Sequence, residues 1–249
     1  MKHKLHILFA VGMMSLFSAS SMATPNIEIL ESDKVESDKV VVAPTHVVEL
    51  FTSQGCSSCP PANKFVGKVA NKDGVLALTY GVTYWDYLGW KDTFGDASFT
   101  KRQREYRPIL GTSNIYTPQI VLNGAKHSPR YSEKDVLAAK LPDNAASSRI
   151  LIKDGKIIIE GDAPKGSTLA LVSYRPGQQD VAVKRGENGG KNLSLTNVVT
   201  NVVKMPWKGE MITTKVKVET GMAYAALFHG PATGKIISAA TYTPNTYAP

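Results

Sequence analysis

A chain of 249 residues, 20% of them charged and with a formal net charge of +8, is long enough for one large domain or two small ones. Its lysines are spread along the sequence without a dense basic tract or a nucleic-acid-binding motif, so the charge indicates a solvated surface and we expect no nucleic acid as a partner. Its two cysteines are too few and too close together for a framework of structural disulfides.

Residues 1–23 have the pattern of a secretory signal peptide. Lys2 and Lys4 precede an apolar run over 7–17, and Ser-Met-Ala at 21–23 offers small residues at a cleavage position. The run is shorter than the about 20 residues that a transmembrane helix needs, and no cysteine follows it to carry a lipid. The sequence therefore predicts an exported protein, periplasmic or secreted, without a stable membrane anchor. A buried N-terminal helix is the alternative interpretation.

Residues 24–44 are predicted to form a flexible linker. They are polar and contain the sequence Glu-Ser-Asp-Lys-Val twice in succession, at 31–40. From residue 45 strands and helices alternate. Strands are predicted over 46–51, 75–82 and 119–122, and helices over 58–70, 98–109 and 132–141. This alternation predicts an α/β domain at 45–142.

After Pro142 the pattern changes to short strands separated by turns. Asp154-Gly155 joins apolar runs at 150–152 and 157–159, which is typical of a hairpin. Further strands are predicted over 168–174, 180–184, 198–204, 213–219, 222–229 and 236–241. Residues 147–249 are therefore predicted to form a smaller all-β domain with a sandwich-like architecture.

Cys56 and Cys59 form a C-x-x-C pair between the first predicted strand and the first predicted helix. A pair in that setting indicates a thioredoxin-like domain. Unpaired N–H groups and the helix dipole stabilise a thiolate at a helix N-terminus. We therefore expect Cys56 to lie exposed at that end and to act as the nucleophile. Cys59, one turn further on, is expected to be buried and to resolve the mixed disulfide.

The cysteine pair has alternative uses that the residues leave open. A structural zinc site needs about four ligands, and the chain offers no third cysteine and no histidine pair at ligand spacing. Two thiolates can also hold copper(I), and a disulfide can be chemically inert. We predict no metal site and no organic cofactor, and keep a non-enzymatic copper carrier or a binding protein as the alternative function.

Thr117 and Pro118 come directly before the strand predicted at 119–122. In thioredoxin-like folds a proline in that place has a cis peptide bond, lies opposite the cysteines and exposes backbone to an extended substrate. We expect the same here, with an ordinary trans proline as the alternative. Glu49, in the strand that leads to the cysteines, is a candidate proton relay if it is buried and a surface residue if it is not.

Two further segments are candidates for the surroundings of the cysteines. The aromatic loop at 84–90, which contains Trp85 and Asp86, either lines the redox site or only packs in the core. The glycine-rich segment 186–190 is either a plain hairpin turn or a loop that reaches across to the cysteines.

The segment 48–62, Val-Glu-Leu-Phe-Thr-Ser-Gln-Gly-Cys-Ser-Ser-Cys-Pro-Pro-Ala, resembles the signature of a secreted bacterial family of unknown function with a thioredoxin-like fold. The resemblance continues at 84–92, 102–103, 116–119, 186–189 and 197–199. It implies the fold and a redox-type motif but no substrate. Thr83 is a departure, because an aspartate is expected there.

Together these observations predict an exported thiol–disulfide oxidoreductase. Its expected partners are exported proteins or small-molecule thiols and disulfides.

Overall fold

The computed structural model describes residues 43–142 and 148–243. All of them belong to one compact unit, Glu36–Pro249. The predicted signal peptide at 1–23 and nearly all of the predicted linker at 24–44 lie outside the described residues. Among the residues that are described, no helix is long and apolar enough to cross a membrane.

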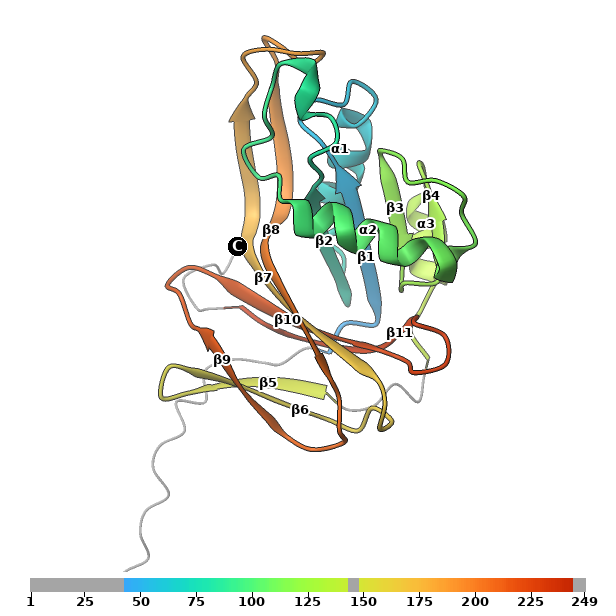
Figure 1. The fold of residues 1–249 in the computed structure, drawn as a ribbon, viewed down its shortest axis with the longest axis vertical. Helices are drawn as coiled ribbons and strands as arrows, with labels where there is room; N and C mark the ends of the chain where they lie inside the picture. Colours follow the sequence, from blue (N-terminus) through green and yellow to red (C-terminus); the bar gives the residue numbers. More distant parts are fainter. Residues whose placement is uncertain (1–42, 143–147, 244–249) are drawn as a thin grey trace, which may run out of the picture. The chain divides into compact units, whose positions relative to one another are not determined.

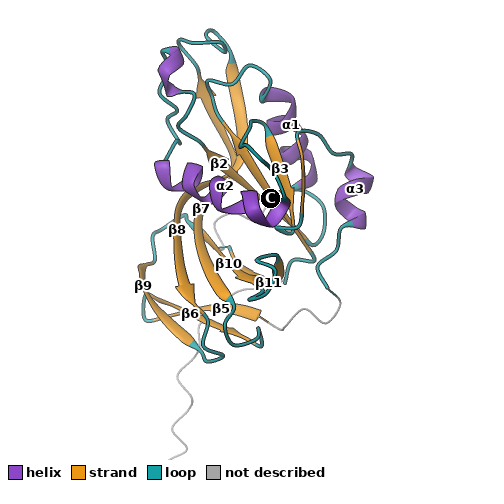
Figure 2. Cartoon of the chain, turned by 45° about the vertical axis from the view of Figure 1, so that its right-hand side comes forward, coloured by secondary structure: helices purple, strands orange, loops and turns teal. Residues whose placement is uncertain are grey.

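The described chain is a mixed α/β structure with few helices and a large sheet (Figures 1 and 2). In chain order the elements are β1 (His46–Thr52), α1 (Pro60–Val69), β2 (Val75–Gly81), the 3-10 helix η1 (Asp86–Leu88), α2 (Ala97–Leu110), β3 (Gln119–Leu122), β4 (Lys126–Ser128), α3 (Glu133–Ala138), β5 (Ser148–Lys153), β6 (Lys156–Gly161), β7 (Thr168–Ala182), β8 (Asn192–Pro206), β9 (Ile212–Lys217), β10 (Ala223–His229) and β11 (Ile236–Tyr242).

Strands from both predicted domains share one sheet. Within the described residues its eight strands have the order β11-β10-β7-β8-β2-β1-β3-β4, and a second sheet has the order β5-β6-β9. The link between the two halves is the pairing of β2 with β8 at Thr79 and Val198. The predicted boundary near 142–147 therefore separates two folding patterns along the chain, but not two independent sheets. The division into two domains at 45–142 and 147–249 stays a prediction.

The alternation of side chains along β1 explains how the sheet is covered on both faces. Val48 and Leu50 pack with Val66 of α1 on one face. Val47 and Phe51 point to the other face, where they join the core that contains α2 and strands β7 and β10. Helices α1 and α2 thus lie on opposite faces of the sheet (Figure 2).

The small sheet covers part of the large one. Ile150 of β5 and Ile157 of β6 share a buried cluster with Leu171 of β7, Phe228 of β10 and Trp207. Since this cluster is separate from the one around α1, the chain has more than one core.

The longest strands differ from the prediction. The sequence predicts two strands at 168–174 and 180–184, but β7 is continuous and runs beside β8 as a long hairpin (Figure 1). The turn signal Pro176-Gly177 falls at a register shift, where Gly177 has a φ of 75°. Pro176 and Gly177 therefore form a bulge in β7, and the strand continues past them. Strand β8 is also longer than predicted, and β4 was not predicted.

Candidate functional site

The cysteine pair lies where the sequence predicts, between β1 and α1. Cys56 and Cys59 are joined by a disulfide with their Cα atoms 5.4 Å apart. Helix α1 begins at Pro60, directly after Cys59, and Pro60 and Pro61 fill its first positions. Proline is tolerated there because its missing N–H would have no intrahelical partner. The loop of residues 53–59, here named the cysteine loop, therefore ends in a helix start that prolines help to define.

Both cysteines are buried, which corrects the expectation of an exposed Cys56. Their exposed fractions are 1% for Cys56 and 0% for Cys59, whereas Ser57 and Ser58 between them are exposed. The Cys59 N–H donates to the Cys56 carbonyl at 3.2 Å, which closes the turn. Cys56 is buried because segments distant in the sequence cover the helix end, and the local sequence does not encode that cover.

The cover includes the tip loop of the β7–β8 hairpin, residues 183–191. The side chain of Asn188 is completely buried, and its Nδ2 donates to the carbonyls of Gln54 at 3.0 Å and Cys56 at 2.9 Å. The Glu187 carboxylate accepts from the Ser57 N–H at 3.1 Å, and hydrogen bonds from the Ser57 hydroxyl and N–H hold the pKa of Glu187 below its ordinary value. Of the two interpretations of segment 186–190, the structure therefore shows a loop that reaches across to the cysteines.

Trp85 links the cysteine loop to the predicted proline site. Its indole Nε1 donates to Thr117 Oγ1 at 2.7 Å. A Cβ added at Gly55 would lie 3.3 Å from the Trp85 Cβ, so the two segments are packed closely. The Thr117-Pro118 peptide bond is cis, as expected from the sequence, and it precedes β3. The structure thus brings Trp85 and Thr117 into one arrangement with the cysteine loop.

Gln54 ties the cysteine loop to the rest of the aromatic loop. Its Oε1 accepts from the Trp90 indole at 2.8 Å, and its own N–H donates to Asp92 Oδ2 at 2.7 Å. Asp86 contacts Asp92 in turn, since the Asp86 Oδ1 accepts from the Asp92 N–H at 3.1 Å. Asp86 therefore supports the loop through Asp92 and makes no direct contact with the cysteines.

Asp92 is the buried acid next to the cysteine loop. It is 3% exposed, and burial raises the pKa of its carboxyl although the N–H groups of Gln54 and Phe94 stabilise the charged form. A buried acid with a raised pKa beside a C-x-x-C loop is a candidate functional group.

Glu49 is buried, but on the face of the sheet away from α1. Arg102 Nη2 lies 2.7 Å from its Oε1, and the Tyr106 hydroxyl donates to its Oε2. Burial alone would raise the pKa of Glu49, but the Arg102 charge and the Tyr106 hydroxyl hold it below its ordinary value. Glu49 is therefore engaged by α2, and the structure does not bring it to the cysteines.

His229 completes this group, here named the charge cluster: Glu49, Arg102, Tyr106 and His229. Its Nδ1 is 2.8 Å from the Gly234 carbonyl and so carries the proton, which leaves Nε2 to accept from Arg102 Nη2 at 3.4 Å. Burial, followed by the Arg102 charge, lowers the pKa of His229 to about 4. The imidazole is therefore neutral near pH 7.

Sequence reasoning singled out neither Asn188 nor Asp92 as a site residue. Both lie in segments that it marked, the glycine-rich segment and the stretch after Trp85. Only their hydrogen bonds to Gln54 and Cys56 reveal the role of each. Among the described residues, no group of three or more His, Cys, Asp or Glu side chains is placed to hold a metal ion.

A model of the family described as "Protein of unknown function (DUF1223)" matches residues 47–228. The chain belongs to the DUF1223 family. The cysteine loop, the aromatic loop and the tip loop all lie inside the matched range. No curated protein matches the chain.

Two solved structures are similar to this DUF1223 protein. The crystal structure of protein AGR_C_4864 from Agrobacterium tumefaciens is 30% identical, with a TM-score of 0.68, and the match covers 84% of this chain and 98% of that one. HBP35 of Porphyromonas gingivalis is 14% identical, with a TM-score of 0.56, over 85% of this chain and 78% of that one. The second likeness concerns the fold alone.

Proposed function

We propose that this DUF1223 protein is an exported thiol–disulfide oxidoreductase built on a thioredoxin-like arrangement of β1, α1, β2, β3 and α3. The observation that carries the proposal is the Cys56–Cys59 disulfide at the start of α1. The cis Thr117-Pro118 bond, linked to the cysteine loop through Trp85, supports it. A C-x-x-C pair so placed can cycle between dithiol and disulfide without a cofactor.

In the oxidising direction a substrate thiolate attacks the Cys56 sulfur. The Cys56–Cys59 bond breaks, its electron pair leaves on the Cys59 sulfur, and a mixed disulfide between substrate and Cys56 forms. A second substrate thiolate then attacks the substrate sulfur of that mixed disulfide and releases Cys56. The products are a substrate disulfide and a reduced pair, and the reducing direction is the reverse. Asp92, whose carboxylate accepts from the Gln54 N–H of the cysteine loop at 2.7 Å, is the candidate acid for proton exchange with a cysteine.

Two variants test the proposal with a disulfide-containing protein such as insulin and with a small-molecule disulfide. Cys56→Ser is expected to abolish exchange on both, since it removes the attacked sulfur. Cys59→Ser is expected to accumulate a mixed disulfide on Cys56, because the resolving thiol is gone. The proposal is wrong if the Cys56→Ser protein exchanges as fast as the unaltered one. Copper(I) retained through both cysteines after desalting, without exchange, would favour the alternative of a metal carrier.

The reduction potential of the pair decides the direction of the reaction. A value near −270 mV, about that of thioredoxin, would indicate a reductant. A value near −120 mV, about that of a strong periplasmic oxidant, would indicate an oxidant.

A further inference from the structure

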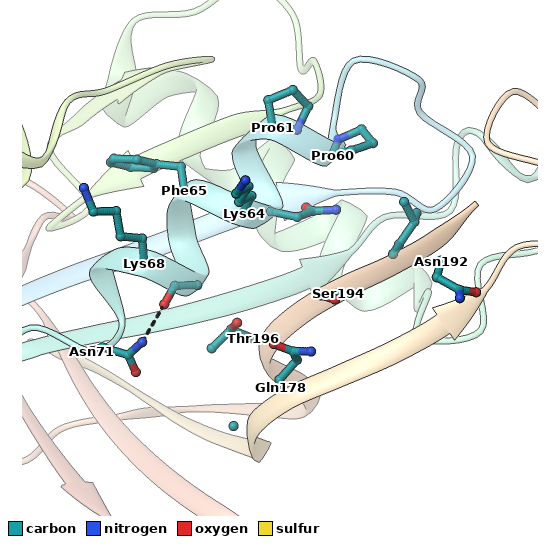
Figure 3. Close-up of a pocket in the computed structure, with 14 residues that line it drawn as sticks. Pro60, Pro61, Lys64, Phe65, Lys68, Asn71, Gln178, Asn192, Ser194 and Thr196 are labelled. Carbon is teal, nitrogen blue, oxygen red and sulfur yellow. Dashed lines mark hydrogen bonds between the residues drawn. The ribbon is translucent and has the colours of Figure 1, made fainter. Parts of the chain in front are cut away.

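A groove with a volume of about 910 Å³ separates α1 from the distal half of the β7–β8 hairpin (Figure 3). Pro60 and Pro61, directly after Cys59, line one end of the groove. Its floor narrows where a Cβ on Gly67 of α1 would come within 3.0 Å of Thr196 Oγ1. The volume lies at the upper end of the range usual for ligand sites, about 300–1,000 Å³. The groove thus begins beside the redox pair and is large enough for a segment of polypeptide.

Between the tip loop and Val198, the edge of β8 that faces this groove has no pairing strand among the described residues. The Val183 N–H donates to the Lys191 carbonyl. In an antiparallel pair every second residue bonds to the facing strand, so Leu193 and Leu195 of β8 are the next residues whose main-chain groups point to β7. By the same alternation, the main-chain groups of Asn192 and Ser194 point away from β7. The Thr196 carbonyl confirms the direction, since it accepts from the Thr79 hydroxyl of β2 at 2.6 Å.

β2 itself pairs with β8 at Val198 and not beyond it towards the tip loop. The alternation along β7 and β8 leaves the main-chain N–H and C=O of Ser194 outside the β7 ladder, and among the described residues β2 pairs with β8 only at Val198. Ser194 and Asn192 are both exposed. A free strand edge of this kind is a template for an added strand.

The charge of the groove is one-sided. Its lining includes Lys64 and Lys68 and contains no acidic side chain. Lys68 is paired with Glu133 at 3.0 Å, so Lys64, which is exposed, is the lysine more available to a ligand. A carboxylate side chain is the complement of such a wall.

We propose that this groove binds an extended, carboxylate-bearing polypeptide segment, which adds as a strand to the β8 edge at Asn192 and Ser194. The inference rests on the proposed function, because it names the substrate class of the same redox site. A bound segment that runs along β8 towards the tip loop would bring its neighbouring cysteine to the Pro60 end of the groove, beside the cysteine loop that carries Cys56. The groove would thus select unfolded or extended chains over small thiols.

The decisive pair of variants is Ser194→Pro and Ser194→Ala. Both remove the Ser194 hydroxyl and its hydrogen bond to Asp180, but only proline removes the outward N–H. Since that N–H does not bond to β7, the hairpin ladder is expected to survive, which thermal unfolding of both variants checks. The probe is a fluorescent peptide of about eight residues, the length of a short strand, with alternating Val and Glu and no cysteine. Its binding to the oxidised full chain is measured by anisotropy.

Ser194→Pro is expected to weaken peptide binding about tenfold, the effect of one lost hydrogen bond, and Ser194→Ala to change it less than about twofold. Lys64→Glu is expected to weaken binding of the Glu-containing peptide and to spare a matched Val and Lys peptide. Methylating the alternate peptide nitrogens that would face β8 should abolish binding. Equal affinities for the Ser194→Pro and Ser194→Ala proteins, both folded, would overturn the strand-addition proposal.

Exchange with a small-molecule disulfide separates this proposal from the proposed function. If the oxidised chain binds the peptide but no variant exchanges any disulfide, the groove stands and the redox function fails. If the small disulfide is turned over but the peptide does not bind, the groove proposal alone fails. A concentration-dependent dimer, seen by sedimentation and lost in Ser194→Pro, would overturn it by assigning the edge to a second copy of the chain.

Discussion

The charge cluster contains a buried carboxylate, Glu49, and another buried carboxylate, Asp92, lies against the cysteine loop, but the two have opposite surroundings. Glu49 faces the guanidinium of Arg102, and its pKa is held below the ordinary value. Asp92 accepts from main-chain N–H groups, no salt bridge to it is found among the described residues, and burial raises its pKa. The difference teaches that burial alone does not decide what an acid does: a paired acid holds two elements together, whereas an unpaired one is able to change its protonation.

The most severe way to break the charge cluster is Arg102→Met. It leaves Glu49 buried without its cation, so we expect the free energy of unfolding to fall by about 3–5 kcal/mol. The double variant Arg102→Met, Glu49→Gln removes both charges and is expected to be less destabilised. Chemical denaturation measures both. If Glu49 has only a structural role, the folded fraction of either protein should exchange disulfides at the unaltered rate.

Acid should weaken the charge cluster through His229. Its pKa is about 4 in the folded chain against 6.5 for an ordinary histidine, so the unfolded chain binds more protons between these values. The stability contribution of His229 is therefore present above pH 6.5 and is lost as the pH falls towards 4. This loss of unfolding free energy amounts to about 3 kcal/mol. At still lower pH, protonation of Glu49 is expected to reduce the stability further, because its folded pKa lies below the ordinary value.

The matched control for this pH effect is His229→Gln, which keeps an acceptor for Arg102 but does not titrate. Its free energy of unfolding should vary less than that of the unaltered chain over the same interval. Parallel curves for the two proteins would contradict the assignment.

Asn188→Ala addresses the cover of the cysteine loop. It leaves the buried carbonyls of Gln54 and Cys56 without their shared donor, which is expected to cost about 1–3 kcal/mol. Alkylation of the reduced protein at Cys56 should also become faster, because Asn188 no longer holds the tip loop against the cysteine loop. Lys191→Met, which removes only a contact to Asn188 Oδ1, is the control. An unchanged alkylation rate in Asn188→Ala would show that the tip loop does not limit access.

Asp92→Asn is expected to have the smallest effect on stability, within about 1 kcal/mol, because a lost acceptor and a lost burial penalty oppose each other. The stability contribution of Asp92 should change with pH in the direction opposite to that of His229. The folded pKa of Asp92 is raised, so its contribution is present at acid pH and is lost as the pH rises through the folded pKa. The difference in unfolding free energy between the unaltered chain and the variant, followed against pH, tests this.

The same substitution tests the redox role of Asp92. If Asp92 exchanges a proton with the cysteines, the pH dependence of the exchange rate should shift in Asp92→Asn while that in Glu49→Gln stays unaltered. If the pH dependence of the exchange rate is the same in the unaltered chain and in both variants, Asp92 has no role in the redox reaction.

The hairpin β7–β8 shows why part of the architecture could not be predicted. Its sequence contains Pro176-Gly177, a turn signal, and the structure uses it as a bulge in a continuous strand. Gly177 N–H donates to the Asn197 side chain on the facing strand at 2.8 Å. Local chemistry predicts a break, but the long-range ladder provides partners that keep the strand going.

The amino-acid sequence by itself determined the position of the cysteine pair, since a strand, a C-x-x-C and a proline start to a helix are local features. It also predicted the proline before β3 and most of the helices and strands. Only the tertiary structure decided that Glu49 pairs with α2, that Cys56 is buried, and that Asn188 holds the cysteine loop. The partners in those contacts are separated by 53 and 132 residues, and no local propensity encodes which buried polar groups will meet across such distances.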